Sequence, residues 1–370
     1  MLDKRFVESQ NSTKVGHRDL EEVVSKIFVA AGCSTFEASQ IAMRLVDSNC
    51  TGHDSHGVVR VTRYLKWVRE QKLVPNQTPE VLFETESIIA VDGRRGFGQT
   101  VAPFALRRGI TKAIDQGVAL VGLRRSGHLG RIGDWAAMAA DQGLCSIHFV
   151  NVNGHVLVAP FGGTDRRMST APIAMGIPRS GEFPVILDFA TSLVAEGKAL
   201  VSLKGGKEIR SDALIGPSGT YTGDPKALYG VTPHGEPPNP KNGPGAIRAF
   251  GDHKGSGLAF MCEALAGIFT GSGSTGSKNV PDHQLWSGMV SILFKADTFI
   301  PFSMFSAELA QFVDFYTGSP RADADVEIKI PGAVENENRI RAHKSGLRVP
   351  DEILADINAA AASLGITERI

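Results

Sequence analysis

The chain has no excess of charge of either sign, no long hydrophobic run and few cysteines. Its 370 residues contain 39 Lys and Arg against 39 Asp and Glu, so the formal net charge is zero. This balance gives no electrostatic support for binding to nucleic acid or to an anionic membrane. No apolar run reaches the length of a membrane span, and residues 1–17 lack the apolar segment of a secretory signal. We therefore expect a soluble, cytoplasmic protein with neither nucleic acid nor membrane as a partner.

The cysteines and the common nucleotide motifs exclude several classes of protein. Cys33, Cys50, Cys145 and Cys262 form no CxxC pair and lie in apolar contexts, so we expect buried free thiols. No Walker motif and no GxSxG elbow is present, so phosphoryl transfer and α/β-hydrolase chemistry have no support. Residues 271–276 fit GxGxxG but follow a predicted helix, and we expect a loop there.

The hydrophobic periodicity predicts an α/β protein. Helices are predicted within 18–49 (two), from the histidine motif to about 71, and at 97–116, 131–142, 252–269, 305–316 and 350–363. Strands are predicted within 80–92 and at 118–123, 145–152, 185–189, 289–295 and 326–330, and loops at 203–242. The alternation of strand and helix between 118 and 152 indicates parallel strand pairing.

The most informative motif is GHDSHG at residues 52–57. If a helix begins near His56, then His56, Arg60 and Arg63 lie on one face at positions i, i+4 and i+7. An enzyme that acts on a small carboxylate needs this pair, because arginine binds the carboxylate and histidine moves a proton. The same residues, His-Asp-Ser, are also typical of a helix N-cap. A zinc site of His53 and His56 has less support, because their spacing is not the i, i+4 pair of a helical site.

Two turns are candidates for binding the phosphates of a nucleotide. Residues 124–130 join a predicted strand to a predicted helix, and His128 within them can bond a cofactor or donate a proton. Asp252 is expected to cap the next long helix, where His253 and Lys254 add positive groups. The alternatives are an ordinary strand–helix turn and an ordinary capped helix.

Several short blocks together resemble the malate/L-lactate dehydrogenase family, which is distinct from the Rossmann-type lactate dehydrogenases. The resemblance covers nearly the whole chain from about Gly16, and it is strongest to the bacterial hydroxycarboxylate dehydrogenase B type. The blocks are residues 52–57, 97–99, 128–133, 146–150, 158–161, 187–192, 253–255 and 261–263.

The resemblance implies an α/β fold with a large mixed sheet and flanking helices, of the non-Rossmann L-sulfolactate dehydrogenase type. It also implies a homodimer. We expect an N-terminal helical part at 1–75 that carries the His56 motif, a central α/β cofactor-binding region at 76–325, and a C-terminal strand and helices at 326–370 that return to the N-terminal part.

The resemblance also implies roles for single residues and no metal. His56 is the expected acid/base, with Ser55 beside it, and either Asp54 or Asp188 supports the imidazole. Arg60 and Thr170 are the expected substrate contacts. The expected contacts of NAD or NADP are His56, His128, Gly130, Arg131, Ile132, Ile186, Leu187, Asp188, Phe189, Ala190, His253, Lys254, Gly332, Ala333, Val334 and Glu335.

Two positions depart from the family pattern. Ala171 stands where the family often has Asn, and Ala333 stands where many members have Glu. The first change removes an amide near the substrate or cofactor, and the second removes a carboxylate expected to contact a ribose. Arg124 and Arg125 are available to receive the 2′-phosphate of NADP.

These observations predict reversible hydride transfer between a nicotinamide cofactor and the C2 carbon of a 2-oxo or 2-hydroxy acid. The nearest alternative is a reductase of a cyclic imine carboxylate. Alternatives of other classes are a nucleotide-binding protein without turnover and a metal-dependent hydrolase that uses His53 and His56.

Overall fold

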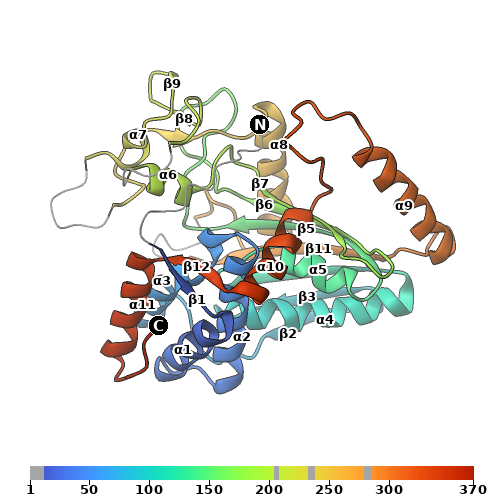
Figure 1. Ribbon diagram of the computed structural model, residues 1–370, viewed down its shortest axis with the longest axis horizontal. Coiled ribbons are helices and arrows are strands. Elements are labelled where there is room, and N and C mark those ends of the chain that lie inside the picture. Colours follow the sequence, from blue (N-terminus) through green and yellow to red (C-terminus); the bar gives the residue numbers. More distant parts are fainter. Residues whose placement is uncertain (1–11, 204–207, 232–237, 279–284) are drawn as a thin grey trace.

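A seven-stranded mixed sheet forms the centre of the protein in the computed structural model (Figure 1). The structure describes residues 12–203, 208–231, 238–278 and 285–370. In spatial order the strands are β2 (Glu80–Glu84), β3 (Ile88–Asp92), β4 (Val118–Ser126), β11 (Ser287–Lys295), β5 (Leu144–Val152), β6 (Pro172–Ile177) and β7 (Val185–Ala190). Strands β3 and β4 run parallel, and every other neighbouring pair runs antiparallel. The predicted α/β class with a large mixed sheet is confirmed.

Strand β11 lies in the middle of the sheet, between β4 and β5, and is antiparallel to both. The predicted parallel pairing of the strands at 118–123 and 145–152 is therefore wrong. Residues 287–291 of β11 are all buried, as expected of a strand that is covered on both faces. Because β11 comes far later in the chain, the local alternation of strand and helix could not show that it separates β4 from β5.

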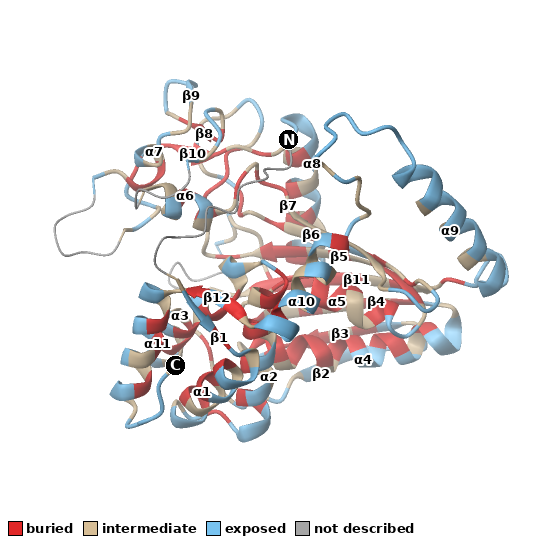
Figure 2. Ribbon diagram, viewed as in Figure 1, coloured by how far each residue is buried: buried red, intermediate tan, exposed pale blue. Residues whose placement is uncertain are grey.

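Helices α4 (Gly98–Gln116) and α5 (Gly133–Ala140) pack against the sheet in one apolar core (Figure 2). The approach of α4 to β4 requires glycine at position 109. A Cβ there would lie 2.2 Å from Cγ2 of Val121. Helix α4 ends at Gly117, whose φ of 87° is the left-handed conformation that glycine adopts without strain.

The two ends of the described chain share a second core. Its helices are α1 (His17–Ala30), α2 (Thr35–Cys50), α3 (Val61–Arg69), α10 (Ala333–Ser345) and α11 (Asp351–Ser363). Leu20 of α1 and Ile357 of α11 belong to the same buried cluster. Strand β1 (Ser12–Val15) pairs antiparallel with β12 (Leu347–Pro350), which fixes the C-terminal segment against the N-terminal helices.

A smaller region contains β8 (Leu214–Ile215), β9 (Tyr221–Thr222) and β10 (Ala246–Ile247) in a three-stranded sheet. Helices α6 (Glu196–Leu203) and α7 (Lys226–Tyr229) belong to the same stretch of chain. The prediction of loops alone at 203–242 is therefore wrong, since β8, β9 and α7 lie within its described part. These elements are only two to four residues long, which is too short to produce a periodic pattern.

The predicted helix at 252–269 is α8 (His253–Cys262), which continues as a π-helical turn over Glu263–Phe269. The predicted cap is wrong, because the Asp252 side chain makes no capping bond. With φ at 56°, its carboxylate instead accepts a hydrogen bond from Arg248 Nη2 at 2.5 Å.

The predicted strand at 326–330 is wrong as well. The segment is irregular, and it meets β7 only through a backbone hydrogen bond just beyond it, from Ile186 N to Pro331 O at 3.1 Å. Alternating apolar and charged residues form a strand only where the edge of a sheet lies within hydrogen-bonding distance. Helix α9 (Phe302–Thr317) precedes this segment and stands off the rest of the molecule, with no buried residue (Figures 1 and 2).

The four cysteines are free and buried, which confirms the prediction. Burial raises the pKa of each thiol, that of Cys145 to about 11, so none is a reactive thiolate at neutral pH. Within the part of the chain that the structure describes, no helix combines the length and apolarity needed to cross a membrane.

His148 makes the stability of the sheet dependent on pH. Its ring is fully buried on β5, and Nδ1 pairs with Ser291 Oγ of β11 at 2.7 Å. Burial lowers the pKa of His148 from 6.5 to about 3. As the pH falls below about 6.5, the unfolded chain takes up this proton first, so stability is lost progressively down to about pH 3.

We expect His148→Gln to flatten the acid side of the stability curve by about 1.4 kcal/mol per pH unit between pH 6 and 4. Urea unfolding at a series of pH values measures this slope. The exposed His343→Gln is the matched control and should keep the wild-type slope. A His148→Gln curve parallel to that of wild type would contradict the assignment.

Candidate active site

The histidine motif folds as two tight turns and not as the start of a helix. Asp54–His56 and Val58–Arg60 form successive 3₁₀ turns, and α3 begins only at Val61. The predicted helix from His56 is therefore wrong. Gly57, between the turns, has ψ near −155°, an extended conformation that interrupts the helical path.

Asn49, at the end of α2, holds the two turns together. Its Nδ2 donates to Asp54 Oδ1 at 2.6 Å, and its Oδ1 accepts from the backbone N of Val58 at 2.8 Å. A Cβ at Gly57 would lie 2.1 Å from Asn49 Oδ1, so this approach requires glycine. Asp54 thus bonds an amide, and the structure gives it no hydrogen bond to the His56 ring. Sequence reasoning missed Asn49, since nothing in its local pattern distinguishes it.

His56 lies between a hydroxyl and a second imidazole. Its Nδ1 is 3.1 Å from Ser55 Oγ, and its ring stacks on that of His128 with centroids 5.5 Å apart and planes 15° apart. Burial, together with the positive charges of Arg60, His53 and Arg131, lowers the pKa of His56 from 6.5 to about 3. The imidazole is therefore neutral at pH 7 and able to accept a proton.

A chain of hydrogen bonds fixes His128, which lies on the turn between β4 and α5. Tyr64 Oη of α3 donates to His128 Nδ1 at 2.7 Å, and Gln99 Nε2 of α4 donates to Tyr64 Oη at 3.1 Å. The backbone N of Gly130 also donates to the same Nδ1, at 3.3 Å. Because a backbone N–H can only donate, Nδ1 is the acceptor and Nε2 carries the proton. Sequence reasoning gave no role to Tyr64 or Gln99.

Arg60 is close to both rings. Its Nε donates to the backbone O of Ser55 at 2.6 Å, and its charge lowers the pKa of both His56 and His128. Burial lowers the pKa of the guanidinium itself. Its terminal nitrogens make no hydrogen bond with any described residue, so they are available to a carboxylate.

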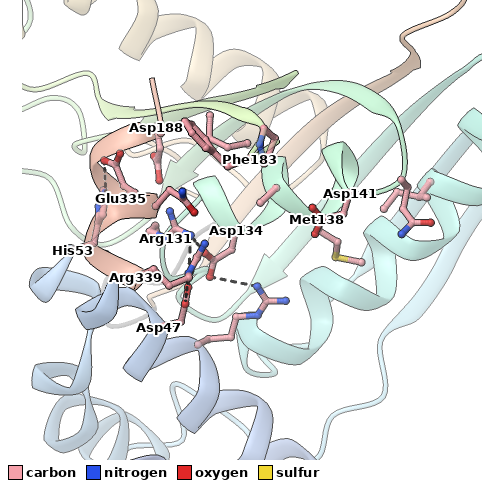
Figure 3. Close-up of a pocket in the computed structure, with 18 of the residues that line it drawn as sticks. Asp47, His53, Arg131, Asp134, Met138, Asp141, Phe183, Asp188, Glu335 and Arg339 are labelled. Atoms are coloured by element: carbon pink, nitrogen blue, oxygen red, sulfur yellow. Dashed lines mark hydrogen bonds and ion pairs between the residues drawn. The ribbon is translucent and has the colours of Figure 1, made fainter. Parts of the chain in front are cut away.

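A cavity of about 710 Å³ has His53 of the histidine motif in its lining (Figure 3). Residues far apart in sequence line it, including His53, Arg131, Asp188 and Glu335. Of the expected cofactor contacts, it contains Arg131, Ile186, Asp188, Gly332 and Glu335. The imidazole of His56 is not part of the lining, but His53 and Arg131, which are, act on its pKa.

Ion pairs tie the cavity wall together across α2, α5 and α10. Arg131 pairs with Asp134 at 2.5 Å, and Arg339 pairs with Asp47 through two bonds of 2.7 Å (Figure 3). Arg44 lies 3.4 Å from Asp134. The Nε atoms of Arg44 and Arg131 are buried and have no hydrogen-bond partner among the described residues. An uncompensated buried donor is costly, and neither atom is accessible from the cavity, so both are a local cost of packing this wall.

Two carboxylates that line the cavity have pKa values shifted in opposite directions. His53 Nε2 donates to Glu335 Oε1 at 3.3 Å, and this bond lowers the pKa of Glu335. Asp188 on β7 accepts from the backbone N of Gly133 at 2.7 Å, while burial raises its pKa. Asp188 therefore faces the cavity and has no hydrogen bond to His56 in the structure.

The remaining expected site residues are outside the lining of this cavity. His253 and Lys254 are exposed at the start of α8, where the His253 ring meets Phe161 at 6.1 Å. The other expected contacts outside it are His128, Gly130, Ile132, Leu187, Phe189, Ala190, Ala333 and Val334. No group of three or more His, Cys, Asp or Glu that could hold a metal occurs within the described residues.

Four further residues considered in the sequence analysis have local constraints. The carbonyl O of Thr170 accepts from the backbone N of Thr191 at 3.0 Å. Ala171 has φ at 29°, a region in which Asn is tolerated better than Ala, so its methyl group stands in a strained position. Arg124 and Arg125 both pair with the buried carboxylate of Asp92 and are not free cations.

The family model described as malate/L-lactate dehydrogenase matches residues 15–358. The chain belongs to this family. It is therefore a dehydrogenase of the hydroxy-acid class. Hydroxycarboxylate dehydrogenase B of Escherichia coli K12 is 34% identical over 361 residues, which cover 96% of each chain.

Solved structures of malate/L-lactate dehydrogenase relatives share the fold. The sulfolactate dehydrogenase of Methanocaldococcus jannaschii superposes with a TM-score of 0.82 at 25% identity, over 96% of this chain and 98% of that one. The Δ1-piperideine-2-carboxylate reductase of Pseudomonas syringae superposes with a TM-score of 0.79 at 27% identity, over 94% and 100%. The predicted fold of the L-sulfolactate dehydrogenase type is confirmed.

The hydrogen bonds of Asn49 to the histidine motif and to Val58 can be tested by mutation. Asn49→Ala leaves the backbone N–H of Val58 without its acceptor, and we expect the free energy of unfolding to fall by about 1–3 kcal/mol. Asn49→Asp combined with Asp54→Asn keeps that acceptor and exchanges the amide and the carboxylate of the second bond, so this double variant should cost less. Urea unfolding measures both variants. Equal losses would show that the bond to Val58 is not what the side chain contributes.

Proposed function

We propose that the protein transfers a hydride reversibly between NAD or NADP and the C2 carbon of a 2-oxo or 2-hydroxy acid. His56 is the acid/base and Arg60 binds the substrate carboxylate. One observation carries this proposal: a neutral imidazole stands with a guanidinium whose terminal nitrogens are free, beside a large cavity. The charges of His53 and Arg131 on the cavity wall act on that imidazole, so the proton-transfer group and the cavity are neighbours.

The cavity residues fit a dinucleotide. Its volume of about 710 Å³ lies within the usual range of cofactor sites. The positive charges of Arg44 and Arg131 in the lining suit the pyrophosphate, and the carboxylate of Glu335 suits a ribose hydroxyl. Gly332, with φ at 90°, brings its backbone against β7, and a Cβ there would lie 3.1 Å from the backbone N of Ile186. When bound, the nicotinamide ring supplies or accepts the hydride.

The proton moves through His56. In oxidation, the neutral ring accepts the proton of the substrate hydroxyl, while Ser55 Oγ at Nδ1 keeps the ring in place. In reduction, the protonated ring returns this proton to the forming alkoxide. The substrate carboxylate on Arg60 offsets the positive charge that lowers the pKa of His56, so substrate binding makes the protonated ring more accessible. His128 offers its Nε2–H as a second donor to the same oxygen.

A reductase of cyclic imine carboxylates is the second candidate. The likeness to Δ1-piperideine-2-carboxylate reductase favours it. Such a substrate also presents a carboxylate to Arg60, and its nitrogen takes the place of the carbonyl oxygen as the proton acceptor. A panel of 2-oxo acids and cyclic imines, each with NADH and NADPH, separates the two. Cofactor binding without turnover of any of them would support the non-catalytic alternative.

His56→Asn should lower kcat roughly 10²- to 10⁴-fold, because it removes the general acid/base while keeping a polar side chain of similar reach. Cofactor affinity, measured by the fluorescence of NADH or NADPH, should change little. The matched control is His343→Gln, which lies outside the site. Near-full turnover by His56→Asn would assign proton transfer to another group, and His128 is then the first to test.

We also propose that the protein is a homodimer, and that α9 is part of the surface between the two copies. None of the residues of α9 is buried, and Phe312 and Phe315 are 59% and 81% exposed. Phe299, just before the helix, is 95% exposed. A monomer in water rarely presents so many aromatic side chains on one element, so a second copy of the chain is the occupant we infer. The cytoplasmic location stays a prediction from the sequence.

Phe315→Asp should convert the dimer to a monomer or raise its dissociation constant at least tenfold, since a carboxylate is costly in an apolar interface. Light scattering after size-exclusion chromatography measures the mass. Glu308→Gln, exposed on the same helix, is the control that should stay dimeric. A wild-type mass of 39.5 kDa would reject the homodimer.

A further inference from the structure

One face of helix α10 holds the segment of chain that leads to His56. The contacts come from Glu335, Asn338 and Arg339, which lie at positions i, i+3 and i+4 and therefore share a face of the helix. Their partners, in the same order, are His53 Nε2 at 3.3 Å, the backbone O of Thr51 at 3.2 Å and the carboxylate of Asp47 at 2.7 Å. Helix α10 thus contacts the end of α2 and the start of the histidine motif together.

The approach of α10 to the motif requires glycine at position 52. A Cβ on Gly52 would lie 2.9 Å from Asn338 Nδ2, and its φ of 87° is the left-handed conformation that glycine adopts without strain. Because no side chain separates the two, α10 lies directly on the backbone of the motif. A displacement of α10 would therefore move the segment that leads to His56.

His53 extends this contact to the groups that we propose act on the substrate. Its backbone O accepts from the backbone N of His56 at 2.8 Å, which closes the first of the two turns. Ser55 lies within that turn, and its backbone O accepts from Arg60 Nε at 2.6 Å. The side chain of His53 thus bonds Glu335, while its main chain positions His56.

Glu335 and His53 also line the cavity, where Figure 3 shows their bond. Their side chains are 33% and 25% exposed, and the 3.3 Å between them slightly exceeds the usual N–H···O distance of about 2.7–3.2 Å. The pair therefore keeps part of its side-chain freedom. A ribose hydroxyl that donates to the Glu335 carboxylate would restrict this freedom, because a carboxylate accepts several hydrogen bonds at once.

Two ligands that need the same side chains ordered assist each other's binding. The first ligand bears the entropic cost of the ordering, and the second then binds more tightly. The dinucleotide would order Glu335 and His53 from the cavity. The acid needs the turn of residues 53–56 ordered, because that turn carries His56 and accepts the bond from Arg60.

We propose that the Glu335–His53 pair couples the cavity to the acid site, so that a dinucleotide in the cavity raises the affinity for a 2-oxo acid. In this role both are positioning residues, since they act through the turn of residues 53–56. The inference rests on the proposed function, which assigns the cavity to NAD or NADP and the acid to Arg60. Because linkage is reciprocal, the acid raises the affinity for the dinucleotide by the same factor.

The test measures the binding of ADP-ribose in the presence and absence of oxamate. ADP-ribose has the ribose hydroxyls but no nicotinamide ring to touch the acid, and oxamate is a 2-oxo acid analogue. Both are anions, so direct electrostatics would make each weaken the binding of the other. In wild type we expect saturating oxamate to lower the Kd of ADP-ribose at least about fivefold, the lower end of typical coupling between sites. Isothermal titration measures this Kd.

His53→Ala should remove the gain and change little the binding of ADP-ribose alone. His53→Gln should restore part of the gain, since its amide still donates to Glu335. Adding Glu335→Ala to His53→Ala should lower the coupling no further, because the two side chains act through one bond. The matched control is Glu337→Ala, an exposed carboxylate of α10 that pairs with Lys329 and lies outside the cavity lining, and it should keep the wild-type coupling.

Hydrogen exchange gives a second readout that needs no turnover. The backbone N–H of His56 is bonded to His53, so ADP-ribose should slow its exchange in wild type and not in His53→Ala. Mass spectrometry of the peptide that contains His56 measures the rate. Melting of the variants at the wild-type temperature excludes a folding defect as the cause of lost coupling.

Independent binding of ADP-ribose and oxamate to wild type would overturn the proposal, as would a coupling that His53→Ala leaves unchanged. Failure of the proposed function gives a different result, because ADP-ribose, NADH and NADPH would then all fail to bind. The coupling would be rejected together with the cofactor site in that case. Binding of the nucleotides without coupling rejects the role of the Glu335–His53 pair alone.

Discussion

The candidate site depends on the hydrogen bond from Tyr64 Oη to His128 Nδ1, at 2.7 Å. This bond joins α3, which follows the two turns after the histidine motif begins, to the turn between β4 and α5. Gln99 of α4 extends it by donating to the same hydroxyl. Because Nδ1 of His128 is occupied as an acceptor, the ring presents Nε2–H and lies flat against His56. The bond therefore helps to hold the His128 ring in contact with the His56 ring, although the two lie on different elements.

The electrostatics of the site follow from burial around fixed cations. Desolvation lowers the pKa of each imidazole, and Arg60 acts in the same direction on both His56 and His128. The imidazoles therefore stay unprotonated beside guanidinium groups. An anionic substrate bound to Arg60 would neutralise its charge and so raise the pKa of His56, although the effect of burial would remain. The arrangement makes the proton affinity of His56 depend on whether the site is occupied.

The cavity wall is assembled from both ends of the chain. Asp47 comes from α2 and Arg339 from α10, and their two bonds of 2.7 Å hold these helices at the same opening. The β1–β12 pairing and the shared apolar core keep the C-terminal segment in position for this contact. The geometry of a site that takes residues from positions 44 to 339 is thus a property of the closed fold and not of any one segment.

The sequence by itself determined the chemistry of the site more than its geometry. Two imidazoles, a hydroxyl and an arginine within nine positions indicated proton transfer beside a bound carboxylate. Of these, Ser55, His56 and Arg60 do lie together, whereas His53 turns to Glu335. The proximity arose in another way than predicted, because Gly57 interrupts the helix and Asn49 folds the motif into two turns. Long elements such as α1, α4 and β4 could be predicted from the hydrophobic pattern, because each buries one face and repeats its pattern over many residues.

Only the tertiary structure decided what depends on contacts between distant segments. Local alternation cannot show that β11 separates β4 from β5, because strand order is set by pairing and not by sequence neighbours. Tyr64 and Gln99 read as ordinary helix residues until α3 and α4 are packed beside His128. Residue types are local properties of a chain, whereas burial, hydrogen-bond partners and net local charge exist only once the chain is folded.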